Sequence, residues 1–191
     1  MARRRRGSPP APALPRTREA IACVLLAIDP GATAGWALFV AGVLREVGIA
    51  KKATQRQAVV QAAIDLAATE GLSLIVVAEA WEAGGWKSHT AMIGTGAQWG
   101  RWQEQLEMVG HPVRRILRVT PQRWRSLVLK ARTKDAAVAY CAARWEGFVF
   151  ATADACEAAC VGAWGTHAGE VAEVVPVRRA RAPRGAGGGG P

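Results

Sequence analysis

Two long apolar runs dominate the hydrophobic pattern of the chain. Residues 22–29 (ACVLLAID) and 72–80 (LSLIVVAEA) are almost continuously apolar over the length of one strand. Such runs are typical of strands buried on both faces of a sheet. Each run ends in an acid, Asp29 in the first and Glu79 in the second. We therefore predict two central strands that carry carboxylates at or near their ends.

Shorter patterns predict three further strands. Residues 35–50 (GWALFVAGVLREVGIA) contain two strand-like segments joined at Ala41-Gly42, which predicts a hairpin. Residues 111–120 (HPVRRILRVT) predict a fifth strand. No repeat occurs at a useful period, so these strands belong to one sheet rather than to a repeat array.

Helical periodicity is clearest in residues 54–70. Thr54 is the predicted N-cap, Gly71 the predicted stop, and the apolar stripe comprises Val59, Val60, Ala63, Ile64 and Ala67. Other helices are predicted at 88–109, at 121–145 with a break near 130–133, and at 153–167. The order of strands and helices predicts an α/β fold, in which helices pack on a mixed sheet.

The length and the charge distribution predict one folded domain between two basic arms. The chain has 191 residues and a formal net charge of +10, and its length suits a single domain. Residues 1–18 carry six Arg and no acid, and the C-terminal stretch ends in RRARAPRGAGGGGP. We predict a disordered arm at 1–20, a folded domain at 21–167 and a disordered tail at 168–191. The arms either only keep the protein soluble or attract a polyanion such as nucleic acid.

Cysteine usage and hydropathy indicate a cytoplasmic protein. Cys156 and Cys160 have a helical spacing that favours core packing over zinc binding, and we expect all four cysteines to be reduced. No apolar run reaches the length of a membrane span, so no membrane partner is expected. We expect a bacterial or phage-infected cell as the compartment, and the Arg-rich start leaves an organelle transit segment as the alternative.

The acids of the predicted core suggest a metal site. If the strands that end at Asp29 and Glu79 are parallel neighbours, their carboxylates converge. Asp154 and Glu157 are spaced i, i+3 near the start of the last predicted helix and share one of its faces. Clustered carboxylates in apolar surroundings favour Mg²⁺ or Mn²⁺. The alternative is that Asp154 only stabilises a helix N-terminus and Glu157 points to solvent.

Several motifs together resemble the RuvC family of Holliday-junction resolvases, particularly its divergent phage-type members. The segments are IDPGATAGWAL, VVAEAWE, VTPQRW, Lys134 and ADACEAACVGAWG, in the order seen in that family. The resemblance extends over about residues 22–167. It implies an RNase H-like fold with a five-stranded mixed sheet of order 3-2-1-4-5, helices on both faces, and a homodimer.

The resemblance also implies a phosphodiester hydrolase with two Mg²⁺ or Mn²⁺ ions per active site. The family's four catalytic acids correspond to Asp29, Glu79, Asp154 and Glu157, of which Glu157 replaces the usual Asp. In the family a basic residue near Lys134 lies close to the cleavage site, so Lys134 is the first choice for this role and Lys130 the second. Such a cation would stabilise charge on the transition state. Glu is one methylene longer than Asp but retains the oxygen donors.

The sequence also offers groups for binding DNA. Residues 114–134 contain a run of basic residues without an acid, which favours phosphate contacts over a solvated helix face. This run comprises Arg114, Arg115, Arg118, Arg123, Arg125, Lys130, Arg132 and Lys134. The loop after Glu79 adds Lys87 and two aromatic residues, Trp81 and Trp86, which either stack on an unpaired base or pack at the sheet edge. Trp124 is interpreted as structural.

These observations predict a metal-dependent endonuclease that resolves four-way DNA junctions by paired, symmetric nicks. Two alternatives stay open. One is an RNase H-like nuclease for other branched DNA or RNA–DNA hybrids, and the other is a catalytically silent module that binds DNA junctions. An actin-type ATPase is not expected, because 191 residues leave no room for a second lobe, so no nucleotide cofactor is predicted.

Overall fold

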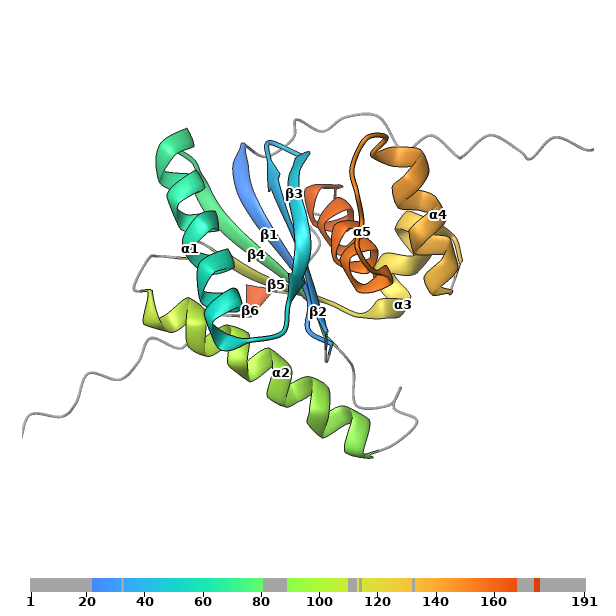
Figure 1. The fold of residues 1–191 in the computed structure, drawn as a ribbon, viewed down its shortest axis with the longest axis horizontal. Helices are drawn as coiled ribbons and strands as arrows, with labels where there is room; N and C mark the ends of the chain where they lie inside the picture. The colour runs from blue at the N-terminus through green and yellow to red at the C-terminus, as the bar shows by residue number, and fades with distance from the viewer. Residues whose placement is uncertain are drawn as a thin grey trace, which may run out of the picture.

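A mixed sheet forms the centre of the molecule (Figure 1). The structure, a computed structural model, describes residues 22–31, 33–80, 89–109, 113, 115–131, 133–167 and 174–175. The strand order is β3-β2-β1-β4-β5-β6. The strands are β1 (Cys23–Asp29), β2 (Ala34–Val40), β3 (Val43–Ala50), β4 (Ser73–Glu79), β5 (Arg115–Val119) and β6 (Val174–Val175).

The predicted five-stranded order 3-2-1-4-5 is confirmed. β1 pairs antiparallel with β2 and parallel with β4, and β4 pairs parallel with β5. β2 and β3 form the predicted hairpin, whose turn residues Ala41 and Gly42 both have positive φ. β6 adds two residues antiparallel to β5, from within the stretch that the sequence analysis assigned to the C-terminal tail.

Helices cover both faces of this sheet. The helical elements are α1 (Ala53–Glu70), α2 (His89–Met108), α3 (Pro121–Trp124), the π-helix η1 (Arg125–Leu129), α4 (Lys134–Arg144) and α5 (Ala153–His167). In Figure 1, α1 and α2 lie on one side of the sheet, whereas α5 lies on the other side with α3 and α4 beyond it. The helices expected at 88–109 and 153–167 are confirmed, as is the break between residues 129 and 134.

One detail of the helix predictions is wrong. α1 begins at Ala53 after an N-cap at Lys52, so Thr54 lies inside the helix. The side chain of Gln55 accepts hydrogen bonds from the backbone N–H groups of Lys51 and Lys52 at 2.9 Å each. Gln55 therefore satisfies donors at this helix start, a role that we had expected of Thr54. The C-terminal stop is confirmed, because Gly71 has a φ of 64°.

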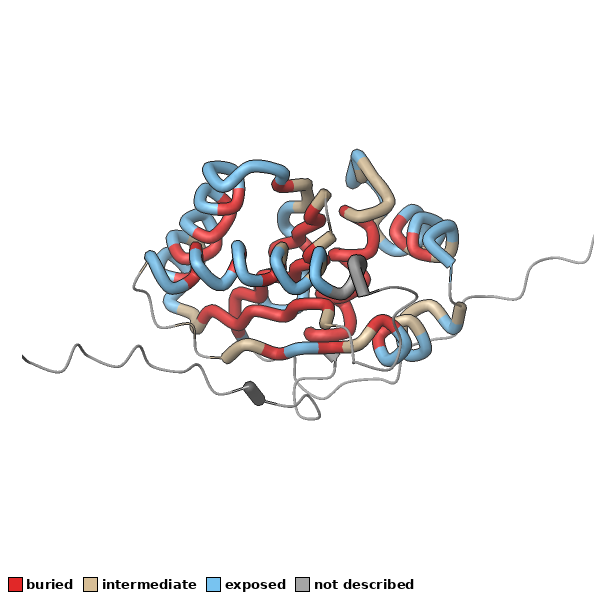
Figure 2. The backbone as a smooth tube through the Cα atoms, turned by 90° about the horizontal axis from the view of Figure 1, so that it is seen from below, coloured by how far each residue is buried: buried red, intermediate tan, exposed pale blue. Residues whose placement is uncertain are grey.

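Alternating side chains of the strands divide the core into two layers. One layer lies between the sheet and α5 and includes Leu25, Phe39, Val77 and Trp164. The other lies between the sheet and the pair α1 and α2, and it includes Trp99 and Trp102. Figure 2 shows the buried strands enclosed by helices whose outer surfaces are exposed. Trp99 and Trp102 are both buried in this second layer.

Glycines allow α5 to pack closely against the sheet. A Cβ atom at Gly162 would lie 2.1 Å from the ring of Phe39, and one at Gly165 would lie 2.7 Å from Cγ2 of Val77. Real Cβ contacts are essentially never this short. The position of α5 therefore depends on the missing side chains at these two residues.

All four cysteines are buried and none forms a disulfide. Cys141, Cys156 and Cys160 belong to the layer under α5, which confirms that Cys156 and Cys160 are core residues. Within the described residues, no helix is both long and apolar enough to cross a membrane.

Candidate metal centre

The two acids from the central strands lie on one face of the sheet. β1 and β4 are parallel neighbours, with Ile28 opposite Ala78. Asp29 and Glu79 end these strands and follow the alternation of Leu25 and Val77, which face α5. The convergence that the sequence predicted for these two acids is confirmed, because both belong to the α5 side of the same sheet end.

The start of α5 supplies the other two acids. The hydroxyl of Thr152 accepts a hydrogen bond from the backbone N–H of Ala155 at 3.2 Å, which satisfies a donor in the first turn. Asp154 lies in that turn, and Glu157 follows three residues later. This spacing directs both carboxylates to the same side of the helix.

Gly35 brings this helix start to the sheet. Gly35 lies opposite Asp29 in the pairing of β1 with β2. A Cβ atom at Gly35 would lie only 2.0 Å from the backbone oxygen of Asp154. A side chain at this position would thus push the first turn of α5 away from Asp29. Sequence reasoning missed this role, because nothing in a linear pattern shows which backbone approaches a strand glycine.

Three of the four acids form a compact group of possible ligands. One carboxylate oxygen from each of Asp29, Asp154 and Glu157 lies within 4.8 Å of the others. Asp29, Glu79 and Glu157 are buried, and the side chain of Asp154 is partly exposed. The alternative in which Glu157 points to solvent is wrong, since its side chain is 3% exposed.

Burial and repulsion from neighbouring acids disfavour the charged forms of Asp29 and Glu79. Burial raises the pKa of Asp29 well above its ordinary value, and the nearby charges of Glu79, Glu157 and Asp154 raise it further. Burial likewise raises the pKa of Glu79 to about 7, although a hydrogen bond from Trp124 opposes the shift. A divalent cation would offset this repulsion, and an all-oxygen set of donors suits Mg²⁺ or Mn²⁺. The residues present therefore fit the predicted metal.

Two basic side chains contact the acids directly. Lys134, at the start of α4, places Nζ 2.7 Å from Oδ1 of Asp154 and 3.1 Å from Oε2 of Glu157. Arg125 forms an ion pair with the other oxygen of Glu157. Burial alone would lower the pKa of Lys134, but its bonds to Asp154 and Glu157 outweigh burial and raise that pKa. Lys134 thus lies where the sequence analysis placed it, beside the acids.

Trp124 has a contact that the sequence analysis did not foresee. Its indole Nε1 donates a buried hydrogen bond of 2.7 Å to Oε2 of Glu79. Trp124 is fully buried, as its structural interpretation required, yet its polar edge faces the acid site. One weak signal pointed to this contact: Trp124 follows β5 in the chain, and β5 pairs with β4, which ends at Glu79.

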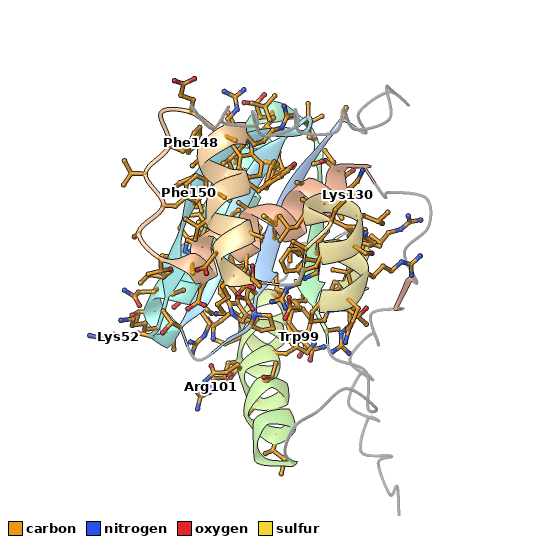
Figure 3. All side chains as sticks on the ribbon, turned by 90° about the vertical axis from the view of Figure 1, so that its right-hand side faces the viewer. Lys52, Trp99, Arg101, Lys130, Phe148 and Phe150 are labelled. Atoms are coloured by element: carbon orange, nitrogen blue, oxygen red, sulfur yellow. The ribbon has the colours of Figure 1, made fainter. Side chains whose placement is uncertain are left out.

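The predicted DNA-binding residues occupy several places. Arg123, Lys130 and Lys134 are exposed, and Arg115 is half-buried. Arg118 lies over the ring of Trp99 at 5.8 Å, on the α2 side of the sheet and so opposite the acids. Figure 3 shows Lys130 well apart from Trp99 and Arg101. The predicted residues outside the described part of the chain are Trp81, Trp86, Lys87, Arg114 and Arg132.

The described basic residues therefore lie on both sides of the sheet. Arg125 differs from the expectation most clearly, because its guanidinium pairs with Glu157 inside the site. Its side chain is only 19% exposed. Lys134 and Arg125 both contact the acids.

Comparison with known proteins identifies the fold. Thermus thermophilus RuvC in complex with a Holliday junction substrate superposes with a TM-score of 0.52 and 17% identity, covering 80% of this chain and 99% of that chain. The chain has a RuvC-like fold. A second Thermus thermophilus RuvC structure gives a TM-score of 0.51 at the same identity and coverage. The yeast mitochondrial Holliday junction resolvase Ydc2 gives 0.43 and 9% identity, over 78% of this chain and 80% of that chain.

By sequence alone, no protein-family model and no curated protein matches the chain. The likeness to RuvC thus lies in the arrangement of the strands and helices. It agrees with the fold that the motif resemblance implied, at an identity too low for a general sequence match.

Proposed function

We propose that this protein is a metal-dependent, structure-selective DNA endonuclease that resolves four-way junctions by paired, symmetric nicks. The observation that carries the proposal is the compact acid group formed by Asp29 at the end of β1 and by Asp154 and Glu157 of α5, with Glu79 at the end of β4 as a neighbouring charge. It is supported by the RuvC-like fold, one of whose solved examples is in complex with a Holliday junction substrate. The acids suit hydrolysis of a phosphodiester better than binding alone, because a purely DNA-binding surface gains nothing from buried negative charge.

The metal ligands proposed are Asp29, Glu79, Asp154 and Glu157, with two Mg²⁺ or Mn²⁺ ions per site. When bound, such ions supply Lewis acidity and lower the pKa of a coordinated water. The protein fixes the donors on rigid elements, since two come from central strands and two from one helix. Three of these acids are buried, and their attraction to a cation is stronger in such low-dielectric surroundings than in bulk water.

Lys134 is proposed to stabilise negative charge on the reacting phosphate. Its side chain is 57% exposed although it contacts Asp154 and Glu157. A long, exposed lysine can leave one carboxylate for a nearby phosphate oxygen without disturbing the fold. The carboxylates would hold the ammonium at the site until substrate arrives.

A dimer is part of the proposal, because two sites related by a two-fold axis would nick two strands symmetrically. We also propose a cytoplasmic location, in keeping with four reduced cysteines. The basic arms are proposed to add sequence-independent attraction to DNA.

The decisive experiment compares labelled four-way junctions, flaps, forks, RNA–DNA hybrids and duplexes in Mg²⁺, Mn²⁺ and chelator. We expect symmetric nicks at the junction centre that require the metal. In Asp29→Asn, cleavage should be lost while junction binding in a mobility-shift assay persists. Asp65→Asn, an exposed acid on α1, is the matched control and should cleave normally.

Each competing function predicts a different result. Preference for flaps or hybrids would favour an RNase H-like nuclease of another specificity. Junction binding without cleavage in either metal would favour a silent binding module and would refute the enzyme proposal.

A further inference from the structure

The residue pair Trp124-Arg125 contacts acids from two different elements of the site. Trp124 donates its indole N–H to Oε2 of Glu79, which ends β4. Arg125 forms an ion pair with Glu157 of α5. Two consecutive residues at the junction of α3 and η1 therefore reach acids that lie 78 positions apart in the sequence.

The two side chains also support each other. The guanidinium carbon of Arg125 lies 5.0 Å from the centroid of the Trp124 ring, which is within the range of a cation–π contact. The indole is fully buried in the layer under α5. Few alternative rotamers are open to a large ring that is packed on all sides and held by a hydrogen bond. Trp124 is thus a rigid donor rather than an adaptable one.

Unlike Asp154 and Glu157, Glu79 has no described salt bridge to a basic side chain. β4 ends at Glu79, and residues 81–88 lie outside the described part of the chain. Neither Lys134 nor Arg125 makes a described hydrogen bond to Glu79, whereas both contact Glu157. Among the described residues, the indole of Trp124 is therefore the group that fixes the rotamer of Glu79 by a hydrogen bond.

We propose that Trp124 is a positioning residue of the metal centre: its indole N–H holds one oxygen of Glu79, so that the other oxygen would be available to a bound ion. Partners of this kind fix ligand orientation in metal sites, and their loss typically weakens metal affinity by about 10–100-fold. Arg125 lies over one face of this ring and forms an ion pair with Glu157. The inference rests on the proposed metal-dependent function.

The test uses the full chain and measures Mn²⁺ affinity by electron paramagnetic resonance, without DNA. Trp124→Phe keeps an aromatic ring in the pocket but removes the N–H. We expect its Mn²⁺ affinity to fall by about 10-fold or more. Trp102→Phe and Trp164→Phe are matched controls, because both indoles are buried and neither Nε1 has a hydrogen-bond partner among the described residues. Their affinities should stay within about 2-fold of the wild type.

A double-mutant cycle separates positioning from packing. If Trp124 acts through Glu79, Trp124→Phe should change Mn²⁺ affinity by less than about 2-fold in a Glu79→Ala background, which lacks both the acceptor and the metal ligand. An equal loss in both backgrounds would mean that Trp124 acts by packing alone and would overturn the proposal. Unchanged Mn²⁺ affinity in the single variant would overturn it too.

A second measurement needs no substitution at Trp124. In ¹⁵N-Trp-labelled wild-type protein, the indole N–H resonance of Trp124 should shift on addition of Mg²⁺, whereas those of Trp102 and Trp164 should not. Binding of Mg²⁺ without a shift of the Trp124 resonance would contradict the proposal. A wild-type protein that binds neither Mg²⁺ nor Mn²⁺ would instead refute the proposed function, and this inference with it.

Discussion

Replacing Glu79 by Gln should stabilise the metal-free protein at neutral and higher pH. Glu79 is buried, and burial raises its pKa from an ordinary 4.5 to about 7. The folded state then binds a proton more tightly than the unfolded state, so this residue lowers stability as pH rises from about 4.5 to 7. The two pKa values correspond to an upper limit of about 3 kcal/mol above pH 7. Gln keeps the size and the acceptor for Trp124 but carries no charge.

The assay is urea unfolding followed by Trp fluorescence at pH 5, 6, 7 and 8, in the presence of a chelator. The free energy of unfolding of Glu79→Gln should exceed that of the wild type by up to about 3 kcal/mol at pH 8, and the difference should fall below about 1 kcal/mol at pH 5. Loss of repulsion with Asp29 acts in the same direction. Glu70→Gln, at an exposed position in α1, should stay within about 0.5 kcal/mol of the wild type at every pH.

Saturating Mg²⁺ should reverse this order, because the metal stabilises only a folded state that offers the ionised ligand. If Glu79→Gln is no more stable than the wild type at pH 8 without metal, the buried acids are not under electrostatic strain. The physical argument for a cation at this site would then fail.

Two other predictions concern the backbone and the lysine of the site. Gly35→Ala should destabilise the protein and weaken Mn²⁺ binding by roughly 10-fold or more, because a Cβ would lie 2.0 Å from the backbone oxygen of Asp154. Gly94→Ala, where a Cβ would meet nothing within 4 Å, should leave Mn²⁺ affinity unchanged and serves as the control; equal affinities in both variants would argue against the close approach. Lys134→Ala should lower the single-turnover cleavage rate of a junction by about 100-fold while Mn²⁺ binding is retained or tightened. A rate within 2-fold of the wild type would remove Lys134 from the mechanism.

The sequence was sufficient for β1 to β5, because their signals are local, but it did not predict β6. The runs that became β1 and β4 were recognisable from continuous apolarity, and the turn at Ala41-Gly42 marked the hairpin of β2 and β3. The acids at or near strand ends followed from the same reading. Order 3-2-1-4-5 did not come from the pattern, and it was expected only through the resemblance of the motifs.

The contacts that assemble the site were beyond a linear reading. Trp124 and Glu79 are 45 residues apart, and the proximity of Gly35 to Asp154 joins β2 to α5. Whether a Trp buried in the core turns its N–H to an acid depends on the packing of three elements at once. Arg125 shows the same limit, since a run of basic residues suggests phosphate binding and cannot reveal that one of them pairs with Glu157.

The close packing of α5 on the sheet determines when the clustered acids of β1 and α5 move apart during unfolding. Gly35, Gly162 and Gly165 bring this helix against strands that form the innermost part of the core. Local opening of an outer element, such as the exposed end of α2, would leave β1 and α5 together. The acids on β1 and α5 can separate only when the core itself opens, so their spacing should persist up to global unfolding.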